Sequence, residues 1–369
     1  MAEFEKLLKI KEALNNKFFE REKEIEGLLV ALLARQHMLL IGPAGTAKSA
    51  LSAELAKIVE GTSYFQWLLT RFTTPEELFG PLSLKELEQG VYKRNTVQKL
   101  PEAQLVFLDE IFKSNSAILN SLLTLINERL FYNNGTPVQT PVMTIVGASN
   151  EYPEDGEGLE ALFDRFLLRF ELDYLGDEQN FISMMKGNGQ MVEMPSVTLE
   201  ELRQFQFYAD MVSIPAEVYS ALSEIRKQLK DEGIRPSDRR FKQSLQLLQA
   251  KALIDQRQQV KVEDILLLAN ALWENIEQKE TVNAIVKANA QDQVSALLEA
   301  IEKDFIEITR DLKNNGSTDA GLEATQKLKD LERQLIPLKD IESRRNDVYS
   351  LITKVQNGRK KIAGEILGV

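Results

Sequence analysis

The residues best suited to chemistry lie in one short stretch near the N-terminus, LLIGPAGTAKSAL (39–51). The stretch fits the pattern G-x-x-x-x-G-K-[ST] of a phosphate-binding loop, except that alanine stands at the last glycine. Backbone N–H groups and the start of the following helix would bind phosphate there. Lys48 would reach the β- and γ-phosphates of ATP, and the Ser49 hydroxyl would ligate Mg²⁺. The predicted binding residues are Gly42, Pro43, Ala44, Gly45, Thr46, Ala47, Lys48, Ser49 and Ala50.

The alanine at position 47 raises the question of whether the loop works. Glycine is needed where φ is positive or where the backbone must touch phosphate, and Gly42 and Gly45 can fill those roles. Because position 47 lies where the helix begins, we expect right-handed helical dihedrals, which alanine adopts without strain. The methyl group should therefore be tolerated. Taken alone, the loop leaves open a chance match, since small residues are common between strand and helix.

Two further polar positions follow apolar strands. LVFLDE (105–110) ends in Asp109, which can hold the Mg²⁺ shell, and Glu110, which can orient and polarise an attacking water. TIVGASN (144–150) ends in Asn150, which can hydrogen-bond that water or the γ-phosphate. Each has a plainer interpretation as an ordinary turn. Because ligands of open α/β sheets collect at the carboxyl edge of the strands, the series favours an ATP site.

The first half of the chain alternates apolar runs with amphipathic stretches, which is typical of an α/β fold with a parallel sheet. A helix is expected over 116–130, and a polar segment over 85–103 looks like a small hairpin insertion. Strands are predicted at 37–41, 64–69, 104–110, 142–149 and 166–172.

Strand signals fade from residue 178, so we predict three domains. These are a nucleotide-binding core over 1–177, an all-helical lid over 178–280 and a helical tail over 281–369. A loop is expected at NNGSTDAG (314–321). The tail has apolar residues at helical spacing, which favours an ordinary helical hairpin, with a partner-docking helix as the alternative. These residues are Leu328, Leu331, Leu335, Leu338, Ile341, Val348, Leu351, Ile352 and Val355.

Composition excludes several classes of site. The chain of 369 residues has no cysteine, so disulfides and thiolate metal sites are absent. Its single histidine, His37, is predicted to be structural, which removes histidine-based zinc sites and Ser-His-Asp chemistry. The net charge of −11 argues against general nucleic-acid binding. With neither a signal peptide nor a membrane span, the expected location is cytoplasmic.

The order of these motifs resembles that of the AAA+ ATPases. The residues within the motifs are similar to those of the MoxR family, most closely its RavA-like subgroup. The matching segments are 39–49, 69–83, 100–129, 147–169 and 236–241, within about 15–275. The resemblance implies an AAA+ P-loop core with a parallel sheet, an all-helical lid and a helical tail. It also implies Mg²⁺-dependent hydrolysis of ATP to ADP and phosphate by a homo-hexameric ring, with nucleotide at the subunit interfaces.

The resemblance also assigns arginines. Arg165 matches the arginine finger, which stabilises charge on a neighbouring subunit's γ-phosphate. Its plainer interpretation is an ion pair with Asp164 or Glu160, and Arg169 is a second candidate for the finger. Arg239 matches the sensor-2 arginine of the lid, which would contact phosphate bound to the same subunit.

The family further implies a chaperone-like role that remodels or matures partner proteins, with a von Willebrand A (vWA) domain protein as partner. The insertion at 85–99 matches a pore-facing hairpin of this clade, or is a plain surface hairpin. The tail departs from the RavA pattern, which has a β-rich inserted domain, so that domain's partner is not carried over.

Three rival functions stay open. A nucleic-acid-associated motor would need a basic insertion, but Glu86 and Glu88 dilute its lysines and arginine. A nucleotide-gated binding module with little turnover is disfavoured because Glu110 and Arg165 are both present. A chelatase-like subunit would share the ring chemistry and differ in its partner.

Overall fold

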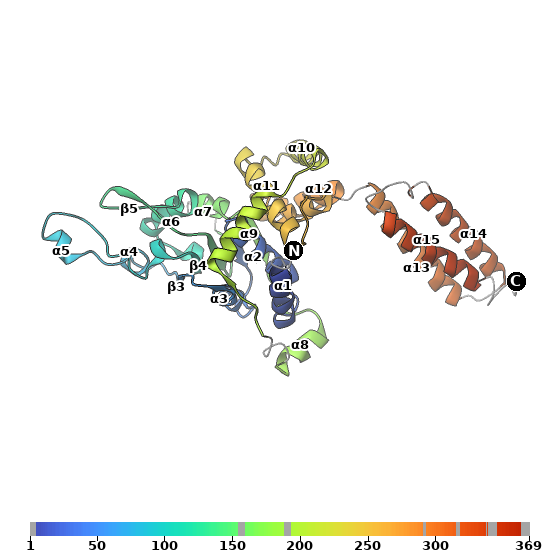
Figure 1. The fold of residues 1–369 in the computed structure, drawn as a ribbon, viewed down its shortest axis with the longest axis horizontal. Helices are drawn as coiled ribbons and strands as arrows, with labels where there is room; N and C mark the ends of the chain where they lie inside the picture. The colour runs from blue at the N-terminus through green and yellow to red at the C-terminus, as the bar shows by residue number, and fades with distance from the viewer. Residues whose placement is uncertain are drawn as a thin grey trace. The chain divides into compact units, whose positions relative to one another are not determined.

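The computed structural model describes residues 5–153, 159–187, 193–290, 293–314, 318–336, 338 and 345–362 (Figure 1). The chain divides into two compact units, Met1–Lys287 and Ala288–Val369. The predicted core and lid therefore pack together as one unit, and the tail begins at Ala288 rather than at residue 281.

A five-stranded parallel sheet forms the centre of the first unit, in the order β3-β4-β7-β1-β8. Leu40 of β1 lies between Ala148 of β7 and Phe170 of β8 in the register. All five predicted strands are confirmed. Every residue of β1 and β7 is buried, as suits inner strands of a parallel sheet that helices cover, whereas only Phe65 is buried in the edge strand β3. Their bounds are β1 (Met38–Ile41), β3 (Tyr64–Leu68), β4 (Leu105–Asp109), β7 (Thr144–Ser149) and β8 (Leu168–Glu171).

Most of the core helices bury apolar residues, whereas α5 (Leu84–Leu87) in the insertion buries none. In α6, Ile118, Leu122, Leu125 and Ile126 are all buried, and Asn115 caps the helix by accepting a hydrogen bond from the Ile118 N–H at 3.2 Å. The core helices are α1 (Glu5–Lys17), α2 (Glu22–Leu33), α3 (Lys48–Ile58), α4 (Pro75–Phe79), α5 (Leu84–Leu87), η1 (Leu100–Glu102), η2 (Ile111–Lys113), α6 (Ser116–Glu128) and α7 (Glu160–Arg165).

His37 has the structural role that was predicted. It is buried just before β1, where its Nδ1 accepts from the Ile145 N–H and its Nε2 donates to the Ile126 carbonyl. Burial lowers its pKa to about 4, so the ring is neutral near pH 7 and joins α6 to β7 through both nitrogens.

A β-hairpin that we did not predict follows α6. Strands β5 (Leu130–Asn133) and β6 (Thr136–Gln139) pair antiparallel across Asn134 and Gly135, whose φ angles are 53° and 72°. Asn-Gly favours this two-residue turn because both positions need positive φ.

The insertion over 85–99 is a loop rather than the predicted hairpin. It carries α5 and one antiparallel bridge between Leu82 and Arg94. The Arg94 N–H donates to Asn133 Oδ1 at 2.8 Å, and Asn133 Nδ2 donates to the Arg94 carbonyl at 3.1 Å. The loop therefore lies against the β5–β6 hairpin, and both extend from the same side of the core (Figure 1).

The predicted helical lid is confirmed, apart from one short strand. β9 (Val197–Thr198) pairs parallel with β2 (Val59–Glu60) of the core. The lid elements are α8 (Glu178–Met185), α9 (Leu199–Met211), α10 (Ala216–Asp231), α11 (Asp238–Ile254), η3 (Val262–Asn270), η4 (Ile276–Gln278) and α12 (Lys279–Ala290).

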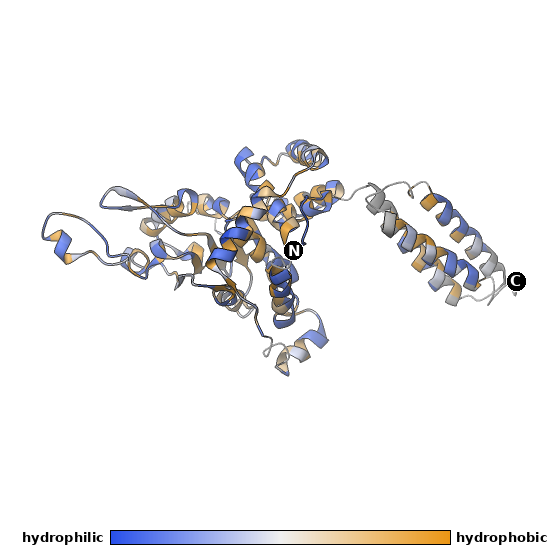
Figure 2. Ribbon diagram, viewed as in Figure 1, coloured by the Kyte–Doolittle hydropathy of each residue, from blue (hydrophilic) through white to orange (hydrophobic). Residues whose placement is uncertain are grey.

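The second unit contains α13 (Gln293–Asn314), α14 (Thr318–Leu335) and α15 (Arg345–Ile362). Each helix carries hydrophobic and hydrophilic residues, as the predicted packing requires (Figure 2). Of the predicted apolar positions, Leu328, Leu331, Leu335, Val348, Leu351, Ile352 and Val355 are buried in one core, and Leu338 packs against it. Ile341 lies outside the described residues. Since α14 begins at Thr318, the loop predicted at 314–321 ends earlier, and 315–317 are not described.

Among the described residues, no helix has both the length and the apolar character needed to cross a bilayer.

The two cores should unfold independently. Leu328 is fully buried in the second unit, so Leu328→Ala should destabilise that unit by about 2–5 kcal/mol. Both tryptophans, Trp67 and Trp273, lie in the first unit. The variant should therefore shift part of the far-ultraviolet circular dichroism transition and leave the tryptophan fluorescence transition unchanged. Ile306→Ala, at an exposed position of α13, is the control; a shift in fluorescence would contradict independent cores.

Candidate active site

The predicted phosphate loop connects β1 to α3, and its neighbours hold its backbone in place. A Cβ on Gly42 would lie 2.1 Å from the Leu172 carbonyl oxygen, so the close passage of β8 excludes any side chain there. Thr46 Oγ1 donates to the Pro43 carbonyl at 2.9 Å, and Arg21 Nε donates to the Thr46 carbonyl at 3.4 Å. The loop is thus anchored on both sides before any ligand binds.

The expected conformation of Ala47 is wrong. Its φ of 70° and ψ of 17° are left-handed, and it is the residue that precedes the first turn of α3. A side chain in this region costs about 1–2 kcal/mol, which explains why the general pattern has glycine there. Ala47 therefore adopts the backbone conformation that glycine would have in this loop, and its side chain makes that conformation strained.

Lys48, Asn150 and Glu110, predicted from separate motifs, form one hydrogen-bonded chain. Lys48 Nζ donates to Asn150 Oδ1 at 2.9 Å, and Asn150 Nδ2 donates to Glu110 Oε1. The ammonium group also donates to two carbonyls of the phosphate loop. Asn150 therefore connects the cation of the loop to the acidic end of β4.

The acidic pair lies at the carboxyl end of β4. Asp109 Oδ1 accepts from the Glu110 N–H at 3.0 Å, and Glu110 itself is left-handed, with φ 51° and ψ 46°. Strained backbone of this kind persists where the surroundings enforce it, as at active sites. Burial lowers the pKa of Lys48, while the charges of Asp109 and Glu110 oppose that shift, which places all three in one electrostatic environment.

Ser49 and Asp109 are the predicted ligands of Mg²⁺. Ser49 lies in the first turn of α3 and Asp109 at the end of β4, and both side chains are only partly buried. The described residues hold no group of three or more acidic, histidine or cysteine ligands. One hydroxyl and one carboxylate suit Mg²⁺, which keeps several waters and binds substrate phosphates.

A cavity of about 500 Å³ adjoins the loop and was missed in the sequence. Tyr174 borders it and donates from its hydroxyl to the Ala44 carbonyl at 3.3 Å. Its apolar walls suit the base of a nucleotide. The only signals were an aromatic pair before α2 and a tyrosine after β8. The apolar lining residues are Phe18, Phe19, Tyr174, Leu175, Phe181 and Met184.

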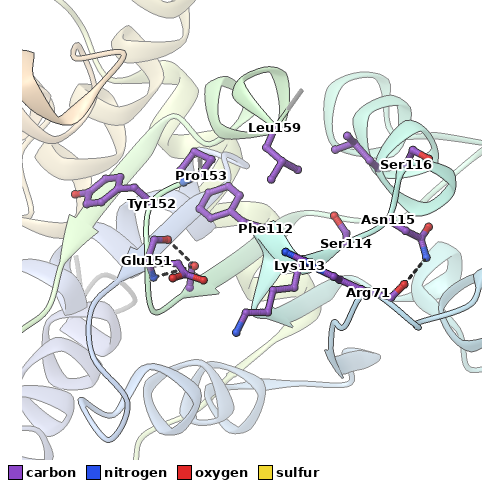
Figure 3. A pocket seen from close by; sticks show the side chains of 12 residues that line it. Arg71, Phe112, Lys113, Ser114, Asn115, Ser116, Glu151, Tyr152, Pro153 and Leu159 are labelled. Atoms are coloured by element: carbon purple, nitrogen blue, oxygen red, sulfur yellow. Dashed lines mark hydrogen bonds between the residues drawn. The ribbon is translucent and has the colours of Figure 1, made fainter. Parts of the chain in front are cut away.

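A second cavity, of about 600 Å³, is lined by residues that follow Glu110 in the chain, among them Phe112 and Lys113 (Figure 3). Arg71 and Lys113 supply its cations, and Lys113 Nζ is 3.2 Å from Glu110 Oε2. Asn115 Nδ2 donates to the Arg71 carbonyl at 3.5 Å, which joins the loop after β3 to the start of α6. The predicted base is therefore flanked by Asn150 on one side and by Lys113 on the other.

The arginines assigned by resemblance meet at one carboxylate. Arg165 Nη1 donates to Asp164 Oδ2 at 3.0 Å, as in the plainer interpretation of this residue, and Arg239 Nη2 is 3.9 Å from the same oxygen. Arg239 also donates to Asn127. The described contacts of Arg239 thus place it beside Arg165 instead of on its own phosphate loop. Arg240 is buried and donates to Asp164 Oδ1 at 2.6 Å, which separates the roles of the two adjacent arginines.

Arg169, the second candidate for the finger, is excluded by burial. Its side chain is fully enclosed, with the guanidinium 4.2 Å from the Phe163 ring centroid and 5.1 Å from that of Trp273. Nε donates to the Phe166 carbonyl at 3.0 Å. Arg169 therefore joins the core to the lid and cannot reach another subunit.

The sheet order, the phosphate loop after β1, the acidic pair after β4 and the polar residue after β7 together define an AAA+ ATPase core followed by a helical lid. The model of the MoxR domain in the MoxR-vWA-beta-propeller ternary systems matches residues 5–226, and an AAA lid domain model matches 217–286. The chain belongs to the MoxR family of AAA+ ATPases, a chaperone-like class. The RavA-like subgroup stays a prediction.

Known relatives agree with this assignment. An uncharacterised protein of Methanocaldococcus jannaschii is 37% identical over 310 residues, which cover 84% of this chain and 80% of that protein. Chaperone MoxR1 of Mycobacterium tuberculosis is 28% identical over 163 residues, 43% of this chain and 42% of that one. A crystal structure of a candidate ATPase from Cytophaga hutchinsonii superposes with a TM-score of 0.63 at 19% identity, over 78% of this chain and 94% of that chain. This last likeness concerns the fold alone.

The strain at Ala47 leads to a stability prediction of unusual sign. Ala47→Gly should raise the free energy of unfolding by roughly 0.5–1 kcal/mol, because relief of left-handed strain exceeds the extra entropy of glycine in the unfolded chain. Ala50→Gly, at an exposed helical position of α3, should instead lower it by about 0.5–1 kcal/mol. Urea denaturation of both variants measures the difference; equal destabilisation would show that position 47 is not strained.

Proposed function

We propose that the protein hydrolyses ATP to ADP and phosphate with Mg²⁺, in a ring of identical subunits whose active sites are completed by a neighbour. A hexamer is the expected ring. The observation that carries this proposal is that Arg165 and Arg239 meet at Asp164, and that the described contacts of Arg239 are with Asp164 and Asn127.

Within one subunit, the residues around Lys48 bind ATP and activate the attacking water. Lys48 exchanges its carbonyl partners for the β- and γ-phosphates, and Ser49 and Asp109 hold the ion that neutralises them. Glu110 takes part as the base that orients the attacking water, and Asn150 holds Glu110 toward the γ-phosphate. The cavity beside the loop receives the base of the nucleotide.

The second half of the site comes from another copy. Around Asp164 lie four arginines, Arg165, Arg169, Arg239 and Arg240, and the charge of Glu274 also acts on Arg169. Cations therefore gather here although the chain as a whole carries −11. Arg169 and Arg240 are buried, while the Arg165 and Arg239 side chains are 26% and 43% exposed. The two exposed arginines would therefore contact the γ-phosphate bound to the next subunit. For Arg239 this is an alternative to the predicted contact with phosphate bound to its own subunit.

Protein partners fit the outer surface better than nucleic acid does. The loop and hairpin expose large apolar side chains, a feature that marks interaction sites. Arg94 is paired with Glu76, and Lys99 donates to the Glu77 carbonyl, so the basic residues of the insertion are partly engaged. A vWA domain protein is the proposed partner, in line with the ternary systems for which the matching family model is named. The exposed apolar residues are Phe72, Leu84, Leu87, Tyr92, Val97, Tyr132 and Val138.

Composite sites lead to a mixing prediction. Glu110→Gln and Arg165→Ala should each abolish most ATP turnover and retain nucleotide binding, and wild-type turnover should rise with protein concentration. Mixing the two variants should restore activity, because about a quarter of the interfaces at equal mixing pair an intact Glu110 with an intact Arg165. The measurement is steady-state phosphate release.

The matched control mixes Glu110→Gln with Lys48→Ala. Lys48 and Glu110 act from the same chain through Asn150. No subunit in this mixture has both residues intact, so no activity should return. Full activity of Arg165→Ala alone, or no recovery in the first mixture, would overturn the composite site. Absent turnover in the wild type would favour the nucleotide-gated binding module.

The metal assignment is tested by its removal. EDTA should abolish turnover and Mg²⁺ should restore it, because an unshielded triphosphate repels the acidic end of β4. Asp109→Asn should raise the Mg²⁺ concentration needed for half-maximal turnover by about tenfold or more, because the ion loses a charged ligand. An unchanged Mg²⁺ dependence would show that Asp109 does not hold the ion.

A further inference from the structure

Asp164 is a carboxylate shared by arginines of the core and of the lid. It lies in α7 of the core, and its two oxygens accept from different elements. Oδ2 faces Arg165 at 3.0 Å and Arg239 at 3.9 Å, and Oδ1 accepts from Arg240 at 2.6 Å.

The contact with Arg165 requires an unusual course of the side chain. Neighbouring residues of a helix point in different directions, so Arg165 must fold back to reach Asp164. Its Nε is buried and has no hydrogen-bond partner, which shows that the fold-back does not satisfy the whole guanidinium group. The ion pair with Asp164 therefore sets the direction of the Arg165 side chain, while Arg165 Nε is left without a hydrogen bond.

Arg240 fixes Asp164 from the lid side. Arg240 is buried, and it donates to the Asp164 carbonyl at 2.8 Å and to the Ala271 carbonyl at 2.6 Å, besides the Asp164 carboxylate. Burial raises the pKa of Asp164, but the hydrogen bond and charge of Arg240, with the charges of Arg169 and Arg165, lower it below the usual value. The carboxylate is thus ionised and immobile, while the arginines on Oδ2 stay partly exposed.

We propose that Asp164 is a positioning residue that holds Arg165 and Arg239 at a set separation, so that core and lid present them to a neighbour's phosphate as one unit. This inference rests on the proposed function. Asp164 touches no nucleotide and acts through the two arginines. Because Arg239 and Arg240 are adjacent in α11 and Arg240 is bonded to Asp164, a shift of the lid would move Asp164 with it and change both phosphate contacts together.

The test is Asp164→Asn in the full chain, with turnover and nucleotide binding measured separately. Asparagine keeps Oδ1 as an acceptor for Arg240, removes the charge, and places an N–H donor where Oδ2 faces Arg165 and Arg239. We expect kcat to fall about tenfold, since the loss acts on charge that develops in the transition state. The Kd for a fluorescent ADP analogue should change by less than about twofold, because Asp164 lies outside the phosphate loop.

Asp210→Asn is the matched control. Asp210 pairs with Arg35 at 2.5 Å, is 44% exposed against 42% for Asp164, and likewise joins the lid to the core. The Asp210→Asn variant should show a similar decrease in its thermal unfolding midpoint and an unchanged kcat. An equal fall of kcat in both variants would mean that any weakened contact between lid and core slows turnover, and would overturn the positioning role.

A double-mutant cycle with Arg239→Ala separates positioning from an independent effect. If Asp164 acts through the arginines, Asp164→Asn should lower kcat much less in the Arg239→Ala background than in the wild type. If the fold-changes in kcat of Asp164→Asn and Arg239→Ala multiply in full, or if Asp164→Asn alone leaves kcat unchanged, this inference is refuted. If Arg165→Ala is itself fully active, the composite site fails; if it is inactive while Asp164→Asn is active, only the role of Asp164 fails.

Discussion

The partly desolvated ammonium group of Lys48 is the charge on which the arrangement of the active site depends. A buried cation needs oxygen partners, and in this fold they come from the loop carbonyls and from Asn150. Because β7 lies between β1 and β4, the residue that ends β7 is placed to connect the lysine after β1 with the glutamate after β4. Strand order, more than any single motif, therefore explains why three residues far apart in sequence act together.

The elements that could be predicted are those whose signal is local. Five apolar runs became the five strands, and a polar residue directly after a buried parallel strand has little choice but the carboxyl edge. The left-handed conformation of Ala47 was signalled by the glycine that the general pattern has at this position, and we misread that signal. The left-handed conformation of Glu110 had no such signal in the sequence. The β5–β6 hairpin is a different case, because its Asn-Gly turn is a local signal that was present in the sequence and that we overlooked.

The arginines show where sequence reasoning stops. Arg239 and Arg240 are adjacent and chemically identical, yet one is half exposed and the other buried, because successive helical residues point about 100° apart. Arg169 was the second candidate for the finger under the family resemblance, but packing against Phe163 and Trp273 makes it part of the core. Which arginine can reach a phosphate depends on how the lid packs, and no local pattern encodes that packing.

The placement of charge also explains why the site should need two copies. In one subunit, Lys48 already has oxygen partners and faces the acidic pair, whereas Arg165 and Arg239 share a single carboxylate oxygen. In the proposed ring, a triphosphate on one copy would supply negative charge to the arginines of another copy, so association and nucleotide binding would reinforce each other. Buried Arg169 and Arg240 add positive charge beside Asp164, and the charge of Glu274 also acts on Arg169. In the proposed ring, these cations would place positive charge near a neighbour's nucleotide, although the chain as a whole is acidic.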